Sequence, residues 1–349
     1  MEKAVFLVSK MDSLSEILIR LERLVTIDTS VSQGRELPAA EYLKAEFERQ
    51  GIPAAVYEPF PGRGSVIAEL AGHSPETLLI LTHLDTADFL PGARNRMIRR
   101  EDRYYGRGTL DCKGLAAIWT QVLCDLYRDL GCPKRSVRFI AAAGEESGGM
   151  VGMDWLSRHT DCLRQVFLAL GEGGGFPVAY KGRWLFTLQT GELAREPPLE
   201  AIYSEEEQLR IVHQACQQGY YSGETLDYFR DLQNAQTSRR VSRESFYRGV
   251  DTLLGQGDCT VLSRYAGLFQ ETLAAFDPGY GLLPVITPGW SDNRFARRAG
   301  IDTIGFFPLS LDNRIGGIHG RNEYINKDSI YLSYKYFYDI LKILIYYDH

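Results

Sequence analysis

Apolar residues recur at helical spacing in several parts of the chain. A helix is expected to begin after a Ser13 cap, because apolar side chains follow every third or fourth position over Leu14–Val25. A second helix is predicted over Ala39–Phe47, with Gly51 at its end. A clear amphipathic pattern over Leu115–Leu126 predicts a third.

Short apolar runs alternate with these helices and read as buried strands. They are Leu78–Thr82, Val137–Ala143, Val166–Leu170 and Thr303–Phe307. The order strand, helix, strand predicts an α/β fold with a mixed, mostly parallel sheet flanked by helices. The pattern over Tyr334–Leu344 predicts a C-terminal helix that docks on this domain.

The pattern changes after Trp184–Leu188 and becomes mainly helical. Four helices are predicted there, over Ser204–Cys216, Leu226–Leu232, Phe246–Leu254 and Val261–Phe269. We therefore expect a catalytic domain formed by residues 1–189 and 283–349, with a helical lid domain inserted at 190–282. His213 lies on an apolar stripe of the first of these helices, which favours a core histidine.

Composition excludes several classes of protein. The 349 residues are 44% hydrophobic and 24% charged with a net charge of −6, which disfavours binding to nucleic acid. No apolar run approaches the roughly 20 residues that span a bilayer, and the first apolar stretch is too short for a secretory signal. Six cysteines without a CxxC pair are typical of reduced thiols, so a cytoplasmic protein without membrane association is expected.

Polar residues follow the predicted strands at the sheet edge where α/β proteins bind ligands. The segments are Thr82–Asp85, Tyr105–Gly114, Gly144–Gly149, Gly171–Gly175 and, after the insertion, Gly317–Glu323. Together they supply two histidines and several carboxylates in glycine-rich loops. Imidazole and carboxylate are the ligands of hydrolytic Zn²⁺ sites, and a pair of ions needs a bridging carboxylate.

Within this set, Asp111 is the best bridging candidate because it lies between the His83 loop and the Glu145–Glu146 pair in the chain. Asp85 is placed to orient the His83 ring by accepting its other N–H. Each of these residues alone has a simpler interpretation. His83 could be an ordinary histidine at a strand end, Asp111 a helix cap and Glu145–Glu146 a solvated acidic pair. The five segments together favour a metal centre over those interpretations.

Neighbouring residues have structural interpretations. Arg107 is expected to hold the loop around Asp111, and Lys113 to lie on the surface of the first helical turn. Cys112 is expected to be a packed thiol rather than a nucleophile or ligand. For Asp292 and Asn293 a role in loop structure is favoured over one in the substrate pocket.

The chain resembles the family of dinuclear zinc exopeptidases and deacylases. This family includes aminoacylase, acetylornithine deacetylase, succinyl-diaminopimelate desuccinylase and glutamate carboxypeptidase. HLD, GRGTLDCKG, GEESGG, LGEGGG and GIHGRNE look like its five metal-centre motifs in the family's order. The resemblance covers about residues 12–190 and 284–328, and the last two motifs look most like the aminoacylase and Gly-X carboxypeptidase branch.

The resemblance implies a role for each motif residue and two divalent ions, with Zn²⁺ expected and Co²⁺ or Mn²⁺ as alternatives. His83 would bind one ion and His319 the other, Asp111 would bridge them, and Glu146 and Glu172 would each complete one shell. Glu145 would be the general base that takes a proton from a metal-activated water and passes it to the leaving amine.

The insertion departs from the family pattern. TLQTGELAREPPLEAI stands where relatives begin a Gly-His-Ser motif whose histidine stabilises the oxyanion, and no such histidine is found. We hypothesise that one or more of eight insert arginines hold the substrate carboxylate; either one of them also replaces the missing donor or the reaction has changed. They are Arg195, Arg210, Arg230, Arg239, Arg240, Arg243, Arg248 and Arg264. The resemblance also implies that the lid can form a homodimer.

The leading hypothesis is a hydrolase that cleaves an amide bond of an N-acyl amino acid or small peptide. Two alternatives remain open. The same centre could serve a larger or carrier-linked biosynthetic substrate, in deprotection or amide formation, or the protein could be a non-catalytic metal-binding relative.

Overall fold

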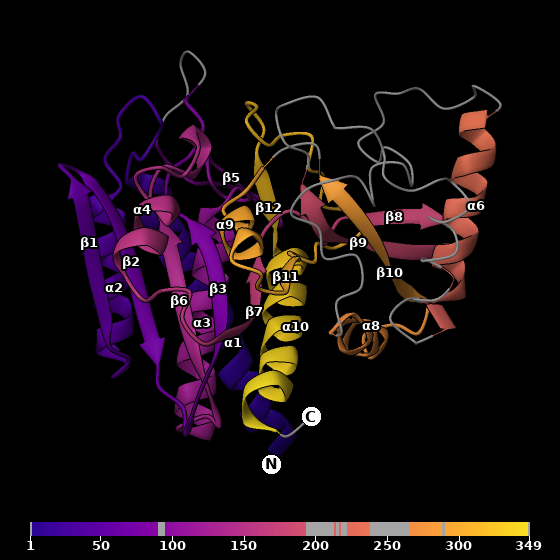
Figure 1. Cartoon of the computed structure of the whole chain (residues 1–349), viewed down its shortest axis with the longest axis horizontal. Coiled ribbons are helices and arrows are strands. Elements are labelled where there is room, and N and C mark those ends of the chain that lie inside the picture. Colours follow the sequence, from indigo (N-terminus) through magenta and orange to yellow (C-terminus); the bar gives the residue numbers. More distant parts are fainter. Residues whose placement is uncertain are drawn as a thin grey trace. The chain divides into compact units, whose positions relative to one another are not determined.

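The computed structural model describes residues 2–89, 95–192, 213, 216–217, 222–237, 265–287 and 290–347 (Figure 1). The chain divides into two compact units. The first unit comprises Met1–Phe167 and Leu309–His349, and the second comprises Leu168–Pro308. The expected insertion at 190–282 falls within the second unit, and its boundaries remain a prediction.

The sheet strands of the first unit lie in the order β1-β2-β6-β3 (Figure 1). Their bounds are Ala54–Phe60, Arg63–Leu70, Arg135–Ala142 and Ser74–His83, respectively. β3 and β6 are parallel, whereas β2 is antiparallel to both β1 and β6. The strands predicted over Leu78–Thr82 and Val137–Ala143 are therefore confirmed. The β1–β2 hairpin was not expected from the sequence.

Helix α3 (Lys113–Leu130) directly precedes β6, and the apolar residues of its predicted stretch Leu115–Leu126 are buried as the sequence pattern predicts. The other described helices of this unit are α1 (Glu2–Thr26), α2 (Leu37–Arg49), α4 (Met153–His159) and α10 (Lys327–Tyr346). The rings of Trp119 on α3 and Phe337 on α10 stack with centroids 3.8 Å apart. The predicted docking of the C-terminal helix on the first domain is thus confirmed.

The expected cap at Ser13 is wrong. The first helix begins upstream, and Ser13 is a buried residue inside α1 whose hydroxyl donates to Asp125 Oδ2 at 2.7 Å. A serine next to an apolar run has the same local pattern as a cap, and only the buried acceptor on α3 distinguishes the two cases. Gly51, in contrast, follows α2 with φ +78°, as a C-terminal glycine does.

A small antiparallel sheet connects two distant parts of the first unit. Its strands lie in the order β12-β5-β4, with bounds Tyr324–Asn326, Arg103–Tyr105 and Ile98–Arg100. Main-chain pairing also continues beyond β5, because Gly106 N donates to Glu323 O at 3.1 Å. The sheet thereby brings the segment after His319 to the loop that carries Asp111.

The second unit has strands in the order β7-β11-β9-β10, with β8 paired to β9. Their bounds are Val166–Gly171, Thr303–Gly305, Arg183–Glu192, Tyr280–Thr287 and, for β8, Pro177–Tyr180. The described helices here are α6 (Gly223–Thr237), α8 (Ala266–Ala274) and α9 (Asn293–Arg298). β7 with β11 and β9 with β10 are parallel pairs, whereas β9 is antiparallel to β8 and β11. The predicted α/β architecture with a mixed sheet is thus confirmed.

Two of the four helices predicted in the insertion coincide with described ones, since α6 covers Leu226–Leu232 and α8 overlaps Val261–Phe269. The helix predicted over Phe246–Leu254 lies outside the described residues. His213 is exposed, so the expectation of a core histidine is wrong. Among the described helices, none has the length and apolar character needed to cross a membrane.

Candidate metal centre

The parallel pairing of β3 and β6 places the first two motifs at one sheet edge. His83 is the last residue of β3, it is 1% exposed, and it pairs in register with Ala142 at the end of β6. The chain then turns at Gly144, where φ is +70° and a Cβ would lie 2.6 Å from Val151 Cγ2. Glycine is required there, and the turn directs Glu145 and Glu146 back toward His83.

Asp85 holds this turn with its carboxylate. Its two oxygens accept hydrogen bonds from Glu145 N at 3.0 Å and Glu146 N at 2.9 Å. His83 Nδ1 lies 3.0 Å from the main-chain oxygen of Asp85 and 3.4 Å from its Oδ1. The sequence predicted that the Asp85 side chain orients the ring; in the structure the shorter contact is to its main-chain carbonyl.

Asp111 joins the two histidines. Its Oδ1 lies 3.0 Å from His83 Nε2 and its Oδ2 lies 3.0 Å from His319 Nε2. His319 Nε2 is also 3.1 Å from Glu146 Oε1, and Glu146 Oε1 accepts a hydrogen bond from Ala87 N. One carboxylate thus presents a separate oxygen to each imidazole, as a carboxylate that bridges two ions does.

The donor set fits divalent cations. Ligand atoms of His83, Asp111 and Glu146 all lie within 4.8 Å of one another. Two ligands at tetrahedral positions about 2.0 Å from a zinc ion are roughly 3.3 Å apart, close to the nitrogen–oxygen separations around Asp111. His83 Nδ1 faces a main-chain carbonyl oxygen, and Nε2 is on the side of the Asp111 carboxylate. A histidine ligand usually has its second ring nitrogen hydrogen-bonded to such an acceptor, so Nε2 is the atom that would bind an ion.

The electrostatics show how strongly these groups interact. Burial by itself would raise the pKa of Asp111, but hydrogen bonds from His319 and His83 outweigh it and hold that pKa well below its usual range. The hydrogen bond to Asp111, followed by that to Glu146, raises the pKa of His319 to about 10. Positive charge is therefore stabilised between Asp111 and Glu146, which is where cations would bind.

Six of the seven residues predicted for the site belong to the first unit, and the contacts above bring them together there. Glu145 Oε2 lies 4.0 Å from His83 Nε2, so the candidate base borders the cluster. The seventh, Glu172, belongs to the second unit, directly after β7. Its carbonyl accepts a hydrogen bond from the buried Asn293 side chain at 2.9 Å, a loop-structural role for Asn293.

Glu323 is a supporting residue to which the sequence interpretation assigned no role. It is 3% exposed, and its Oε1 accepts from Leu110 N at 3.0 Å and from Asp111 N at 3.1 Å. Its Oε2 pairs with Arg107 Nη1 at 2.9 Å, so Arg107 holds the Asp111 loop as expected. The only signal in the sequence was the glutamate at the end of GIHGRNE.

Lys113 corrects a prediction. It was expected on the surface, yet it is 2% exposed and its Nζ donates to Ile27 O at 2.9 Å. Burial lowers the pKa of Lys113 to about 8. Cys112 is fully buried, in agreement with a packed thiol. Of the eight candidate arginines, Arg230 is described and lies 3.7 Å from Asp227, and the other seven lie outside the described residues.

Comparison with known proteins gives relatives for part of the chain. It is 26% identical over 166 residues to a probable succinyl-diaminopimelate desuccinylase of Staphylococcus aureus, covering 45% of this chain and 40% of that protein. It is 30% identical over 167 residues to an acetylornithine deacetylase of Photorhabdus laumondii, and this match covers 44% of this chain and 40% of that protein. These matches thus span about 40% of the length of the relatives.

Solved structures share the fold over nearly the whole chain. A metallo-carboxypeptidase of the M20 family from Sulfolobus solfataricus has a TM-score of 0.65 at 16% identity, covering 94% of this chain and 99% of that one. Human carnosine dipeptidase 1 has a TM-score of 0.63 at 12% identity, and the match covers 95% of this chain and 97% of that one. The family model of peptidase family M20/M25/M40 matches residues 79–343, well over half of the sequence. The resemblance predicted from the five motifs is confirmed: this chain belongs to peptidase family M20/M25/M40.

Proposed function

We propose that this protein hydrolyses an amide bond of an N-acyl amino acid or a small peptide. Two divalent cations, expected to be Zn²⁺, would be held by His83, Asp111, Glu146, Glu172 and His319. The observation that carries the proposal is the contact of each Asp111 oxygen with a different imidazole at 3.0 Å. When bound, such cations act as Lewis acids on a carbonyl oxygen and make water more acidic.

Glu145 is the proposed proton carrier. Its carboxylate borders His83, while the carboxylate of Asp85 fixes its main-chain nitrogen at the turn. Glu145 accepts a proton as water adds to the amide carbon, and it donates that proton to the leaving nitrogen as the carbon–nitrogen bond breaks. Because Glu146 is held by Ala87 N and faces His319, the two adjacent glutamates have different tasks.

The relatives support this class of reaction by their names, which include a desuccinylase, a deacetylase and a cysteinylglycine-S-conjugate dipeptidase. All three names denote cleavage of an amide or peptide bond next to an amino acid. We also propose that the protein forms a homodimer and is located in the cytoplasm.

The test is Glu145→Gln, assayed with N-acetyl and N-succinyl amino acids, dipeptides and longer peptides in buffers containing Zn²⁺, Co²⁺ or Mn²⁺. We expect turnover to fall by about 10²–10⁴, the usual contribution of general acid–base catalysis, while bound metal stays at the wild-type level. Glu69→Gln is the matched control, because this glutamate is about half exposed and pairs with Arg138 away from the cluster.

Unchanged turnover in Glu145→Gln would remove that residue from the mechanism. If the wild type bound metal but cleaved no member of the panel, the non-catalytic alternative would be favoured. Activity limited to the longest peptides would instead support the alternative of a larger substrate.

A further inference from the structure

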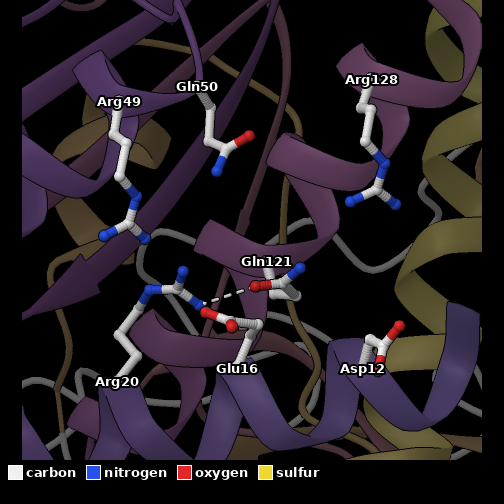
Figure 2. A pocket seen from close by; sticks show the side chains of 7 residues that line it. All are labelled: Asp12, Glu16, Arg20, Arg49, Gln50, Gln121 and Arg128. Atoms are coloured by element: carbon white, nitrogen blue, oxygen red, sulfur yellow. Dashed lines mark hydrogen bonds between the residues drawn. The ribbon is translucent and has the colours of Figure 1, made fainter.

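A polar pocket with a volume of about 500 Å³ lies in the first unit. Figure 2 shows the seven side chains that line it, every one of them charged or an amide. They come from three helices: Asp12, Glu16 and Arg20 from α1, Arg49 and Gln50 from the end of α2, and Gln121 and Arg128 from α3.

The pocket is separate from the metal centre. Helix α3 begins at Lys113, two residues after Asp111, and Gln121 and Arg128 follow 8 and 15 positions further along it. At 1.5 Å per residue these side chains are attached about 12 and 22 Å from the start of the helix. None of the seven lining residues belongs to the metal-centre motifs, so the pocket is not a subsite of that centre.

The floor of the pocket is rigid. Arg20 is 2% exposed; its Nε and Nη2 donate to Glu46 Oε2 at 3.2 and 2.9 Å, and its Nη1 donates to Gln121 Oε1 at 3.0 Å. Gln121 in turn donates to the buried Asp125. Because each of these groups is held by another, the floor keeps its shape before a ligand arrives.

Arg49 and Arg128 supply hydrogen-bond donors at the rim. Arg49 donates to both oxygens of Glu46 at 2.9 and 3.0 Å, while Arg128 donates to Asp125 at 2.8 Å and Asp129 at 3.1 Å. Both side chains are about half exposed. A guanidinium has five N–H donors, so each retains donors for a carboxylate after these contacts. In Figure 2 they extend from the same side as Gln50.

Helix α1 supplies acceptors on the other side (Figure 2). Asp12 and Glu16 are four residues apart on α1, and both are exposed. In the described part of the chain, neither carboxylate has a hydrogen bond or an ion pair. Two like charges at this spacing repel each other, so an ammonium group between them would be stabilised.

The charge balance decides the class of ligand. Arg49 and Arg128 lie on the opposite side of the pocket from Asp12 and Glu16, while Arg20 lies beside Glu16 on α1 (Figure 2). All three arginines are already paired with Glu46, Asp125 or Asp129. A phosphate-like anion would therefore meet no excess of positive charge. A molecule with one carboxylate and one ammonium group would complement both sides, and the volume lies within the range of small-ligand pockets, about 300–1,000 Å³.

We propose that this pocket binds a small zwitterion, an amino acid or short peptide, with its carboxylate toward Arg49, Gln50 and Arg128 and its ammonium group toward Asp12 and Glu16. The pocket is formed by residues of the three helices alone, so this binding does not depend on the reaction at the metal centre.

The experiment is calorimetric titration of the whole protein with glycine, β-alanine, 4-aminobutyrate and 6-aminohexanoate, a series that contains no peptide bond and varies the distance between the charges. We expect saturable binding of at least one member. Its singly charged analogues, with the amine acetylated or the carboxylate converted to an amide, should bind at least 10-fold more weakly, because each loses one charge-assisted contact.

Two variants locate the binding. Arg128→Gln and the pair Asp12→Asn with Glu16→Gln should each weaken it at least 10-fold, and these exposed side chains can be replaced without unfolding the protein. Glu145→Gln should bind like the wild type, which separates this pocket from the metal centre. The proposal is overturned by no saturable binding, by binding that the pocket variants leave unchanged, or by tighter binding of inorganic phosphate than of any zwitterion.

Discussion

The interaction of Glu323 with Arg107 provides a quantitative test of how the Asp111 loop is held. The two side chains are 2% and 5% exposed and lie 2.9 Å apart, and Glu323 also accepts from two main-chain nitrogens. Removing one partner of a buried pair costs about 3–5 kcal/mol, because the other charge stays buried without compensation. Glu323→Ala should therefore lower the free energy of unfolding by about that amount.

Such a loss is a large fraction of the roughly 5–15 kcal/mol that stabilises an ordinary domain. Glu323→Gln is the milder variant, because its amide oxygen can still accept from Leu110 N and Asp111 N. It loses the ion pair, so we expect a cost of about 1.5–3 kcal/mol. Replacing Arg107 by Met in the Glu323→Gln background removes the uncompensated charge and should cost less than the sum of the two single changes.

The assay is urea unfolding followed by circular dichroism for the wild type, Glu323→Ala, Glu323→Gln, Arg107→Met and the double variant of the last two. The control is the same cycle for Arg138 and Glu69, a pair in which the glutamate is 47% exposed and a coupling of about 0–1 kcal/mol is expected. If the Arg107–Glu323 coupling is no larger than that of the control pair, the reasoning about burial is refuted.

Three other changes should have measurable effects. Trp119→Ala removes the ring that stacks on Phe337 and should destabilise the protein by about 3–5 kcal/mol in urea unfolding. Asp111→Asn removes the charge between the two histidines and should lower the bound Zn²⁺ measured by mass spectrometry after dialysis. At pH 8, iodoacetamide should label the exposed Cys132 well before Cys124, because burial raises the pKa of Cys124 to about 12; peptide mapping would measure the order.

Each of these predictions has a contrary outcome. Tyr331→Ala, at a 45% exposed site on α10, is the control for Trp119 and should change stability little, so equal losses at both sites would contradict the packing argument. Wild-type zinc content in Asp111→Asn would argue against a bridging role. Equal labelling of Cys124 and Cys132 in the folded protein would show that Cys124 is accessible.

Much of the fold and of the site could be predicted because the signals are local. The apolar runs that became β3 and β6 and the amphipathic pattern of α3 have periodicities that follow from backbone geometry. Since parallel strands end at one sheet edge, His83 and Glu145 could be expected to lie close together. Asp111 and His319 belong to separate segments of the chain. They could be included in the predicted site because the five motifs occur in the order typical of the family.

The amino-acid sequence alone was therefore enough to predict the strand and helix pattern, the family and the set of candidate ligands. Which groups surround those ligands became known only from the folded chain. Lys113 is buried and donates to Ile27 O, and Ser13 on α1 donates to Asp125 on α3. Glu323 supports Asp111 although the two residues are more than two hundred positions apart in the chain. The physical reason is that burial and hydrogen bonding depend on neighbours distant in the chain, which the local periodicity of side chains does not specify.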